Sequence, residues 1–116
     1  MRKMMFGGIA LAVVLASGMV HAQEWPTHTL TMINPFAAGG PNDVPGRLFA
    51  QRMGEILGQK VIIENVGGAG GMTGAMRVAH AAPDGYTFLQ GTVGTQVQSQ
   101  ALHKKPAYDA LKDFVS

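Results

Sequence analysis

The apolar residues of this chain fall into short runs, and each run is followed by a loop rich in glycine. Leu30–Ile33, Val61–Ile63 and Tyr86–Leu89 contain the β-branched, aliphatic and aromatic residues that favour strands. Between the runs, apolar positions recur every three or four residues, which predicts helices. Besides a long helix after the first run, shorter ones are expected over residues 73–82 and, more weakly patterned, 96–102. The pattern therefore predicts three strands that alternate with helices.

The long helix has clear start and stop signals. Asn42 or Asp43 can cap its first turn, Pro45 is tolerated there, and Gly58 is a natural end. The expected core face of this helix consists of five apolar residues at helical spacing: Val44, Leu48, Met53, Ile56 and Leu57.

Strands joined by helices through short connections favour a mainly parallel sheet. Because Val61–Ile63 is a continuous apolar run, we expect it to form a buried strand of that sheet. In such sheets ligands bind outside the carboxyl ends of the strands. The three glycine-rich loops, residues 35–40, 67–71 and 91–95, all follow those ends. The sequence therefore predicts an α/β fold with one shared binding site.

The loop after the first strand has the chemistry of an anion site. Its candidate ligand-binding residues are Ala37, Ala38, Gly39 and Gly40. Their small side chains leave backbone N–H groups accessible at the start of a helix, where a carboxylate can accept charge-assisted hydrogen bonds of about 1.5–3 kcal/mol each. Asp43 would repel an anion at contact distance, so we assign it a structural role as a cap that holds the loop. A tight turn that binds nothing is the alternative reading.

The other two glycine-rich loops carry weaker signals. Thr92 and Thr95 in the third loop offer hydroxyl groups that can donate to a carboxylate, although threonine at a strand end is often only structural. The second loop, with Gly68 and Gly70, lacks the spacing of a dinucleotide fingerprint, and the third strand ends in Gln90 instead of an acidic residue. We therefore interpret the second loop as a close approach of helix to sheet.

Residues suited to catalysis or metal binding are not grouped in the sequence. Ser99 lies outside any nucleophile-elbow pattern, and His28, His80 and His103 do not have metal-ligand spacing. We therefore expect no enzyme activity, no catalytic residue, no metal and no cofactor. A small exported nucleotide-binding enzyme is the weakest alternative.

Residues 1–22 have the pattern of a secretory signal peptide. Arg2 and Lys3 precede the uncharged run Phe6–Ala16, which is too short to span a bilayer, and an A-x-A-like site ends at Ala22. We expect cleavage after Ala22 and a periplasmic location. The formal net charge is +2, and loss of Arg2 and Lys3 would leave basic and acidic residues equal in number. Nucleic-acid binding is therefore not indicated.

Several segments occur in an order that identifies a family. They are PFAAGGPND at residues 35–43, GQKVIIEN at 58–65, GAGG at 68–71, APDGYT at 82–87, GTVGT at 91–95, and YD with KDF at 108–114. Together they resemble the Bug-type, or tripartite tricarboxylate transporter, substrate-binding proteins. The resemblance extends over nearly all of residues 23–116.

The resemblance implies a three-layer, parallel-sheet domain of the type II-like periplasmic-binding-protein fold. Family members are much longer, so residues 23–116 correspond to the N-terminal part of the solute-binding domain, and the second domain is absent. The resemblance also implies a non-catalytic receptor that holds a small carboxylate mainly through backbone amides of the first loop. Carried onto this chain, the resemblance points to Phe36, Ala37, Ala38, Gly39 and Gly40, supported by Thr92 and Thr95. Such receptors deliver solutes to membrane permease components or serve a sensor. A non-functional truncated fragment of such a receptor is the alternative.

Overall fold

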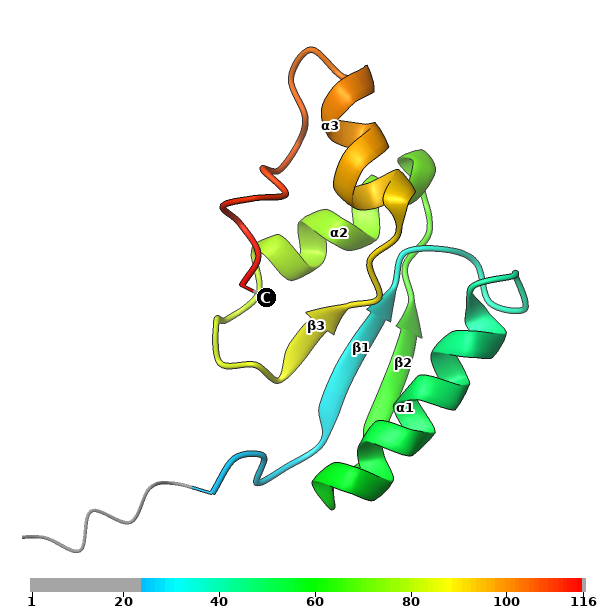
Figure 1. Ribbon diagram of the computed structural model, residues 1–116, viewed down its shortest axis with the longest axis vertical. Coiled ribbons are helices and arrows are strands. Elements are labelled where there is room, and N and C mark those ends of the chain that lie inside the picture. The colour runs from blue at the N-terminus through cyan, green and yellow to red at the C-terminus, as the bar shows by residue number, and fades with distance from the viewer. Residues whose placement is uncertain (1–23, 116) are drawn as a thin grey trace, which may run out of the picture.

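The computed structural model describes residues 24–115 (Figure 1). The predicted signal peptide and its cleavage site lie outside these residues. The strands are β1 (Leu30–Asn34), β2 (Val61–Asn65) and β3 (Thr87–Leu89), and the helices are α1 (Asp43–Leu57), α2 (Met72–Ala79) and α3 (Ser99–Leu102). A 3₁₀ turn, η2 (Ala69–Gly71), precedes α2, and a π-helical turn, η3 (Gly94–Gln98), leads into α3. The predicted alternation of strands and helices is confirmed, with element ends shifted by a few residues.

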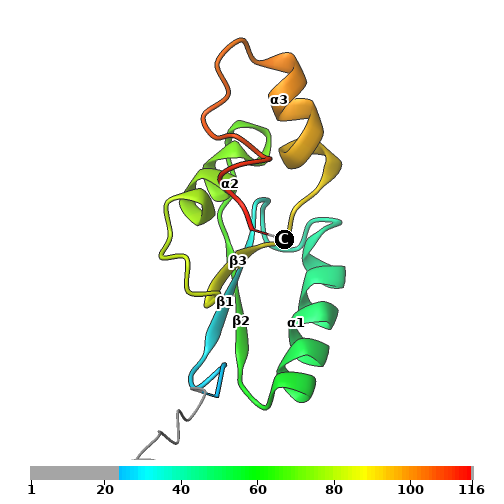
Figure 2. The same cartoon turned by 60° about the vertical axis from the view of Figure 1, so that its left-hand side comes forward.

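The three strands form one parallel sheet in the order β2-β1-β3. Leu30 of β1 lies opposite Val61 of β2, and Ile33 of β1 lies opposite Leu89 of β3. Helix α1 covers one face of the sheet and α2 lies on the other (Figure 2). This arrangement confirms the expected three-layer α/β fold.

The core follows β1, because within residues 24–115 only this central strand has a neighbour on each side. Leu30, Met32 and Ile33 are 0%, 3% and 1% exposed. The prediction that Val61–Ile63 forms a buried strand is wrong: β2 is an edge strand, Ile62 is 36% exposed, and its neighbours are half-buried. An apolar run by itself does not distinguish a central strand from an edge strand.

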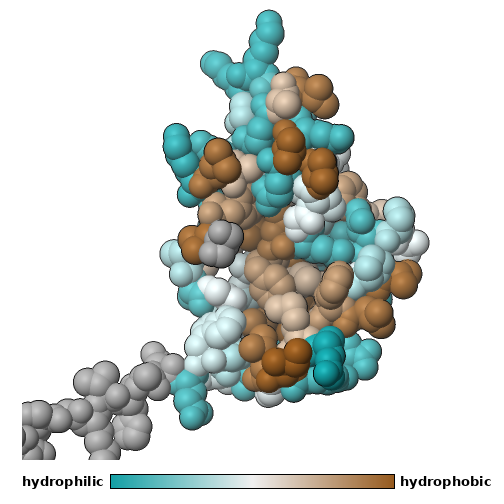
Figure 3. Space-filling model, viewed as in Figure 1, coloured by the Kyte–Doolittle hydropathy of each residue, from teal (hydrophilic) through white to brown (hydrophobic). Residues whose placement is uncertain are grey.

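The expected apolar face of α1 is also largely wrong. Val44, Leu48 and Ile56 are 68%, 70% and 70% exposed, and the other two members of that face are half-buried. The residues that α1 buries are small or polar, and they include Gly46 and Ala50. Brown, hydrophobic side chains accordingly lie along α1 on the surface in Figure 3.

The apolar face of α1 is turned away from the sheet because the backbone of α1 closely approaches the start of β2. A Cβ atom on Gly54 would lie 3.0 Å from the carbonyl oxygen of Gln59 and 3.7 Å from the amide nitrogen of Val61. Small residues at Gly46, Ala50 and Gly54 allow this approach, because they recur every four residues on one side of the helix. The bulkier apolar residues are consequently turned outward.

The C-terminal part of the described chain packs back onto η3 and α3. Tyr108 is 4% exposed, its hydroxyl donates to the carbonyl of Thr95, and it lies 3.0 Å from Oγ of Ser99. Its ring meets Phe114 edge-on at 5.6 Å between ring centroids. Ser99 is therefore a buried structural residue that also donates to the carbonyl of Thr95, at 2.6 Å.

None of the helices within residues 24–115 has the length and apolar character required to cross a membrane.

Candidate carboxylate-binding site

The three glycine-rich loops meet at one rim of the sheet. All strands are parallel, so their carboxyl ends at Asn34, Asn65 and Leu89 point the same way, as the arrowheads in Figure 1 show. A Cβ atom on Gly71 of the second loop would lie 2.7 Å from Cγ2 of Thr95 and 3.2 Å from Cζ of Phe36. One glycine thus lies against both the first and the third loop, and the convergence expected from the sequence is present.

The amides of the first loop divide into free and occupied donors. The N–H of Gly39 donates to Oδ2 of Asp43 at 3.0 Å, and the N–H of Gly40 donates to the carbonyl of Ala37 at 3.3 Å. The N–H of Phe36 makes a long 3.3 Å bond to the side chain of Asn34. Within residues 24–115, the N–H groups of Ala37 and Ala38 donate no hydrogen bond. Both residues are exposed, so these two donors are accessible to a ligand.

Asp43 is held by three hydrogen-bond donors at the base of this loop. Besides Gly39, they are the side-chain amide of Asn65 at 3.0 Å and Nε of Arg47 at 3.0 Å. The hydrogen bond from the Gly39 amide, followed by those from Asn65 and Arg47, lowers the pKa of Asp43 to about 2. The carboxylate, whose side chain is 6% exposed, is therefore ionised at neutral pH and turned toward the loop, and Asn42 makes no side-chain cap bond.

In the third loop, Thr92 and Thr95 bind each other reciprocally. The N–H of Thr92 donates to Oγ1 of Thr95 at 3.0 Å, and the N–H of Thr95 donates to Oγ1 of Thr92 at 3.3 Å. Thr95 is fully buried, and its hydroxyl proton goes to the carbonyl of Thr92 at 3.1 Å. Thr92 is half-buried and its hydroxyl accepts a bond without donating one in the described chain, so Thr92 has a proton to offer.

The second loop contributes more than the sequence indicated. Its residues 68–71 all have positive φ, from 50° at Ala69 to 125° at Gly68, and the N–H groups of Ala69 and Gly70 donate no hydrogen bond within the described residues. Gly67 brings this loop to the first one, since its Cβ position is 3.5 Å from the amide nitrogen of Ala37. The close approach of helix to sheet is also present at Gly74, whose Cβ position is 2.7 Å from the carbonyl of Val66.

The only signal for these extra donors in the sequence is the run of small residues between Gly67 and Gly71, which is equally typical of close packing. The structure separates close packing from open donors by position. Gly74 in α2 packs against the sheet, whereas the amides without a partner lie in the exposed loop before α2. The rim therefore has accessible N–H groups from two loops, at Ala37, Ala38, Ala69 and Gly70, and a hydroxyl donor from the third.

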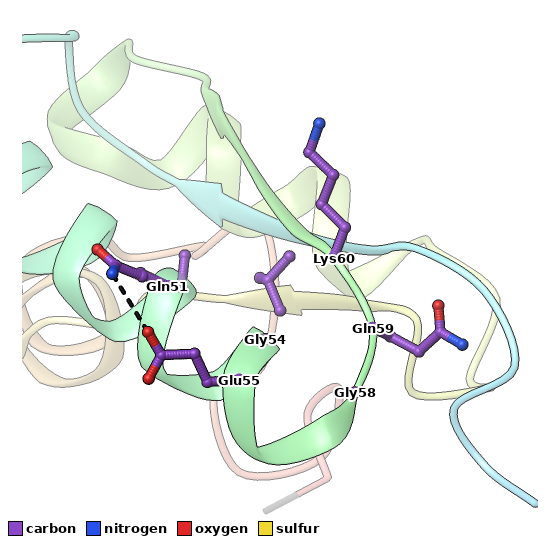
Figure 4. A pocket seen from close by; sticks show the side chains of 8 residues that line it. Gln51, Gly54, Glu55, Gly58, Gln59 and Lys60 are labelled. Atoms are coloured by element: carbon purple, nitrogen blue, oxygen red, sulfur yellow. Dashed lines mark hydrogen bonds between the residues drawn. The ribbon is translucent and has the colours of Figure 1, made fainter.

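A broad hollow elsewhere is separate from this rim. It has a volume of about 410 Å³ and is lined by the second half of α1 and residues 58–61, where Gln51 donates to Glu55 at 3.2 Å (Figure 4). It lies beside the first residue of β2, at the opposite end of the strands from the glycine-rich loops.

Among residues 24–115 no three histidine, aspartate or glutamate side chains are grouped in a way that could hold a metal ion.

A parallel sheet covered on both faces, with open backbone amides at its carboxyl rim, can bind a small ligand at that rim. Comparison with known proteins agrees. Residues 46–116 match the profile of the tripartite tricarboxylate transporter family receptor, and the chain belongs to this family. A curated relative from Agrobacterium vitis, a UPF0065 protein of the TAR-I ttuE-ttuC' intergenic region, is 42% identical over 112 residues, which cover 96% of this chain and 32% of that protein.

Solved structures of relatives have the same fold. MatC from Rhodopseudomonas palustris, with bound malate, is 50% identical with a TM-score of 0.74, over 78% of this chain and 31% of that one. Rpa4515 of R. palustris, with adipate, is 39% identical with a TM-score of 0.69, over 75% of this chain and 29% of that one. The chain spans about a third of the length of the curated relatives that it matches. The resemblance seen in the sequence is therefore confirmed.

Proposed function

We propose that this protein is a periplasmic receptor, without catalytic activity, that binds a small carboxylate at the rim of its sheet. Phe36 to Gly40 form the binding loop, with Ala37 and Ala38 as the direct donors and Gly39 and Gly40 shaping the loop through their internal bonds. Thr92 donates its hydroxyl, and Thr95 holds the third loop in place. The protein is exported by a cleavable signal peptide and hands its solute to the membrane permease of a tripartite tricarboxylate-type transport system, or to a sensor.

The single observation that carries this proposal is the pair of N–H groups at the exposed residues Ala37 and Ala38, which donate no hydrogen bond within residues 24–115. They lie at the carboxyl end of the central strand, just before α1, where the helix dipole favours negative charge. Asp43 is the nearest acidic group of this loop, but its charge is offset by Arg47 and by the donors that bind it. The relatives MatC and Rpa4515 hold malate and adipate, both dicarboxylates, which supports a small carboxylate as the ligand of this chain.

Two substitutions of one exposed residue test the proposal, in the protein expressed from its complete gene. Ala38→Asp puts a carboxylate beside the expected ligand, and Ala38→Asn is its uncharged control of nearly equal size. Two like charges about 4 Å apart near a protein surface repel by about 4 kcal/mol, so we expect the Asp variant to bind at least tenfold more weakly than the Asn variant.

The measurement is isothermal titration calorimetry with malate and with adipate at low and high salt. The difference between the two variants should shrink as salt increases, because exposed charges are screened. Equal affinities of the Asp and Asn variants at low salt would mean that the carboxylate does not bind at this loop.

A further inference from the structure

Three amide side chains form a row across the sheet just below the first loop. On one side of the central strand, Asn34 pairs in register with Asn65. On the other side, Ile33 pairs with Leu89, and the N–H of Gln90 donates to the carbonyl of Ile33 at 2.9 Å. Gln90, the next residue after Leu89, therefore lies opposite Asn34. Asn65 bonds to Asp43 of α1, so the side chain of Asn65 is on the α1 face. In a parallel sheet residues in register share a face, which puts all three amides beneath the start of α1.

This amide row holds both ends of the first loop. At the beginning of the loop, the N–H of Phe36 donates to Oδ1 of Asn34 at 3.3 Å. The carbonyl of Phe36 accepts a hydrogen bond from Nδ2 of Asn65 at 3.2 Å. At the end of the loop, Nε2 of Gln90 donates to the carbonyl of Asn42 at 2.8 Å. The open amides of the loop lie between these attachment points, so their direction depends on the row.

Gln90 has the most demanding position of the three. It reaches from the end of β3 across to α1, 48 residues away in sequence, and this path runs over Gly46. A Cβ atom on Gly46 would lie 2.3 Å from Oε1 of Gln90 and 3.0 Å from its Cδ. Only glycine at this position leaves room for the observed side chain of Gln90.

The row also contains an unpaired donor and an unpaired acceptor on neighbouring strands. Within the described residues, Nδ2 of Asn34 and Oε1 of Gln90 are buried without a hydrogen-bond partner, and Asn34 is 0% exposed. Buried polar atoms are costly to leave unpaired, and these two have complementary chemistry on the same face. The two atoms do not bond each other, so the observed link of Gln90 to the first loop is its bond to the carbonyl of Asn42.

We propose that Gln90 is a positioning residue of the carboxylate site: by holding the carbonyl of Asn42 between the first loop and α1, it fixes the direction of the Ala37 and Ala38 amides. This inference rests on the proposed function for its effect on affinity. Its effect on the shape of the loop is independent of any ligand, so the two can fail separately.

The experiment uses two variants that disturb the same contact from opposite sides. Gln90→Met keeps the length of the side chain and removes the donor to Asn42. Gly46→Ala keeps the residue Gln90 but pushes its side chain away, since a Cβ at Gly46 would lie 2.3 Å from Oε1 of Gln90, while alanine is a better helix former than glycine. Gln59→Met is the control, because Gln59 is also half-buried but lies at the opposite end of the strands.

Amide hydrogen exchange and ¹⁵N chemical shifts report the shape of the loop, and malate titration reports binding. We expect both loop variants to accelerate exchange at Gly39, to shift the Ala37 and Ala38 resonances, and to weaken malate binding at least tenfold, with less than a twofold change for Gln59→Met. Unchanged loop resonances, or equal weakening by Gln59→Met, would overturn the inference. A disturbed loop in a protein that binds no carboxylate would support the positioning role and overturn the proposed function.

Discussion

The contact of Gly71 with the other two loops gives the sharpest test of how the rim is assembled. Gly71 and Gly70 are neighbours, with φ of +92° and +66°, so alanine is strained at either position. They differ in surroundings: a Cβ on Gly70 meets nothing within 4 Å, whereas one on Gly71 lies 2.7 Å from Cγ2 of Thr95. Gly70→Ala is therefore a matched control for Gly71→Ala.

The two costs can be estimated separately. Alanine in the left-handed region costs about 1–2 kcal/mol, which applies to both variants. Carbon atoms pack best at about 3.5–4.0 Å, and overpacking of this kind adds about 1–3 kcal/mol. Thr95 cannot easily move away, because it is 0% exposed and its hydroxyl is bonded to Thr92. We expect a loss of unfolding free energy of about 1–2 kcal/mol for Gly70→Ala and about 2–5 kcal/mol for Gly71→Ala.

The assay is urea denaturation followed by circular dichroism, in the protein expressed from its complete gene. Gly71→Ala should also change the ¹⁵N resonances of Thr92 and Thr95, while Gly70→Ala should not. Equal losses of unfolding free energy in the two variants, together with unchanged third-loop resonances, would refute the reasoning, because the three loops would then not be in contact at Gly71.

Three further predictions concern other parts of the fold. Because the folded pKa of Asp43 is about 2 and the ordinary value is about 3.9, its contribution to stability should be complete above about pH 4 and be lost as the pH falls toward 2; Asp43→Asn should flatten this part of a plot of urea midpoint against pH. Tyr108→Phe removes a buried hydrogen bond and should lower the unfolding free energy by about 0.5–1.5 kcal/mol in urea titrations, and an unchanged midpoint would contradict the structure. On α1, Ala50→Leu should destabilise by about 1–3 kcal/mol and exposed Leu48→Ala by no more than about 0.5 kcal/mol; the reverse order in thermal unfolding would mean that the opposite face of the helix is buried.

The sequence by itself determined the order of elements and the rim at which the glycine-rich loops meet. Short β-branched runs, glycine-rich loops and one well-delimited helix are local signals, and they led correctly to a parallel sheet with its loops at one rim. The positions of Pro45 and Gly58 set the ends of α1 because the conformations that these residues favour are properties of the chain itself.

Only the tertiary structure decided which groups at those positions are buried, bonded or free. Small residues let α1 approach the sheet with Gly46 and Ala50 inward, and β2 is only half-buried because it lies at the sheet edge. Likewise, the amide of Gly39 is bonded because Asp43 points toward it, whereas those of Ala37 and Ala38 donate to no group within residues 24–115. Such outcomes depend on distances between segments far apart in the sequence, which periodicity and local conformational preference do not contain.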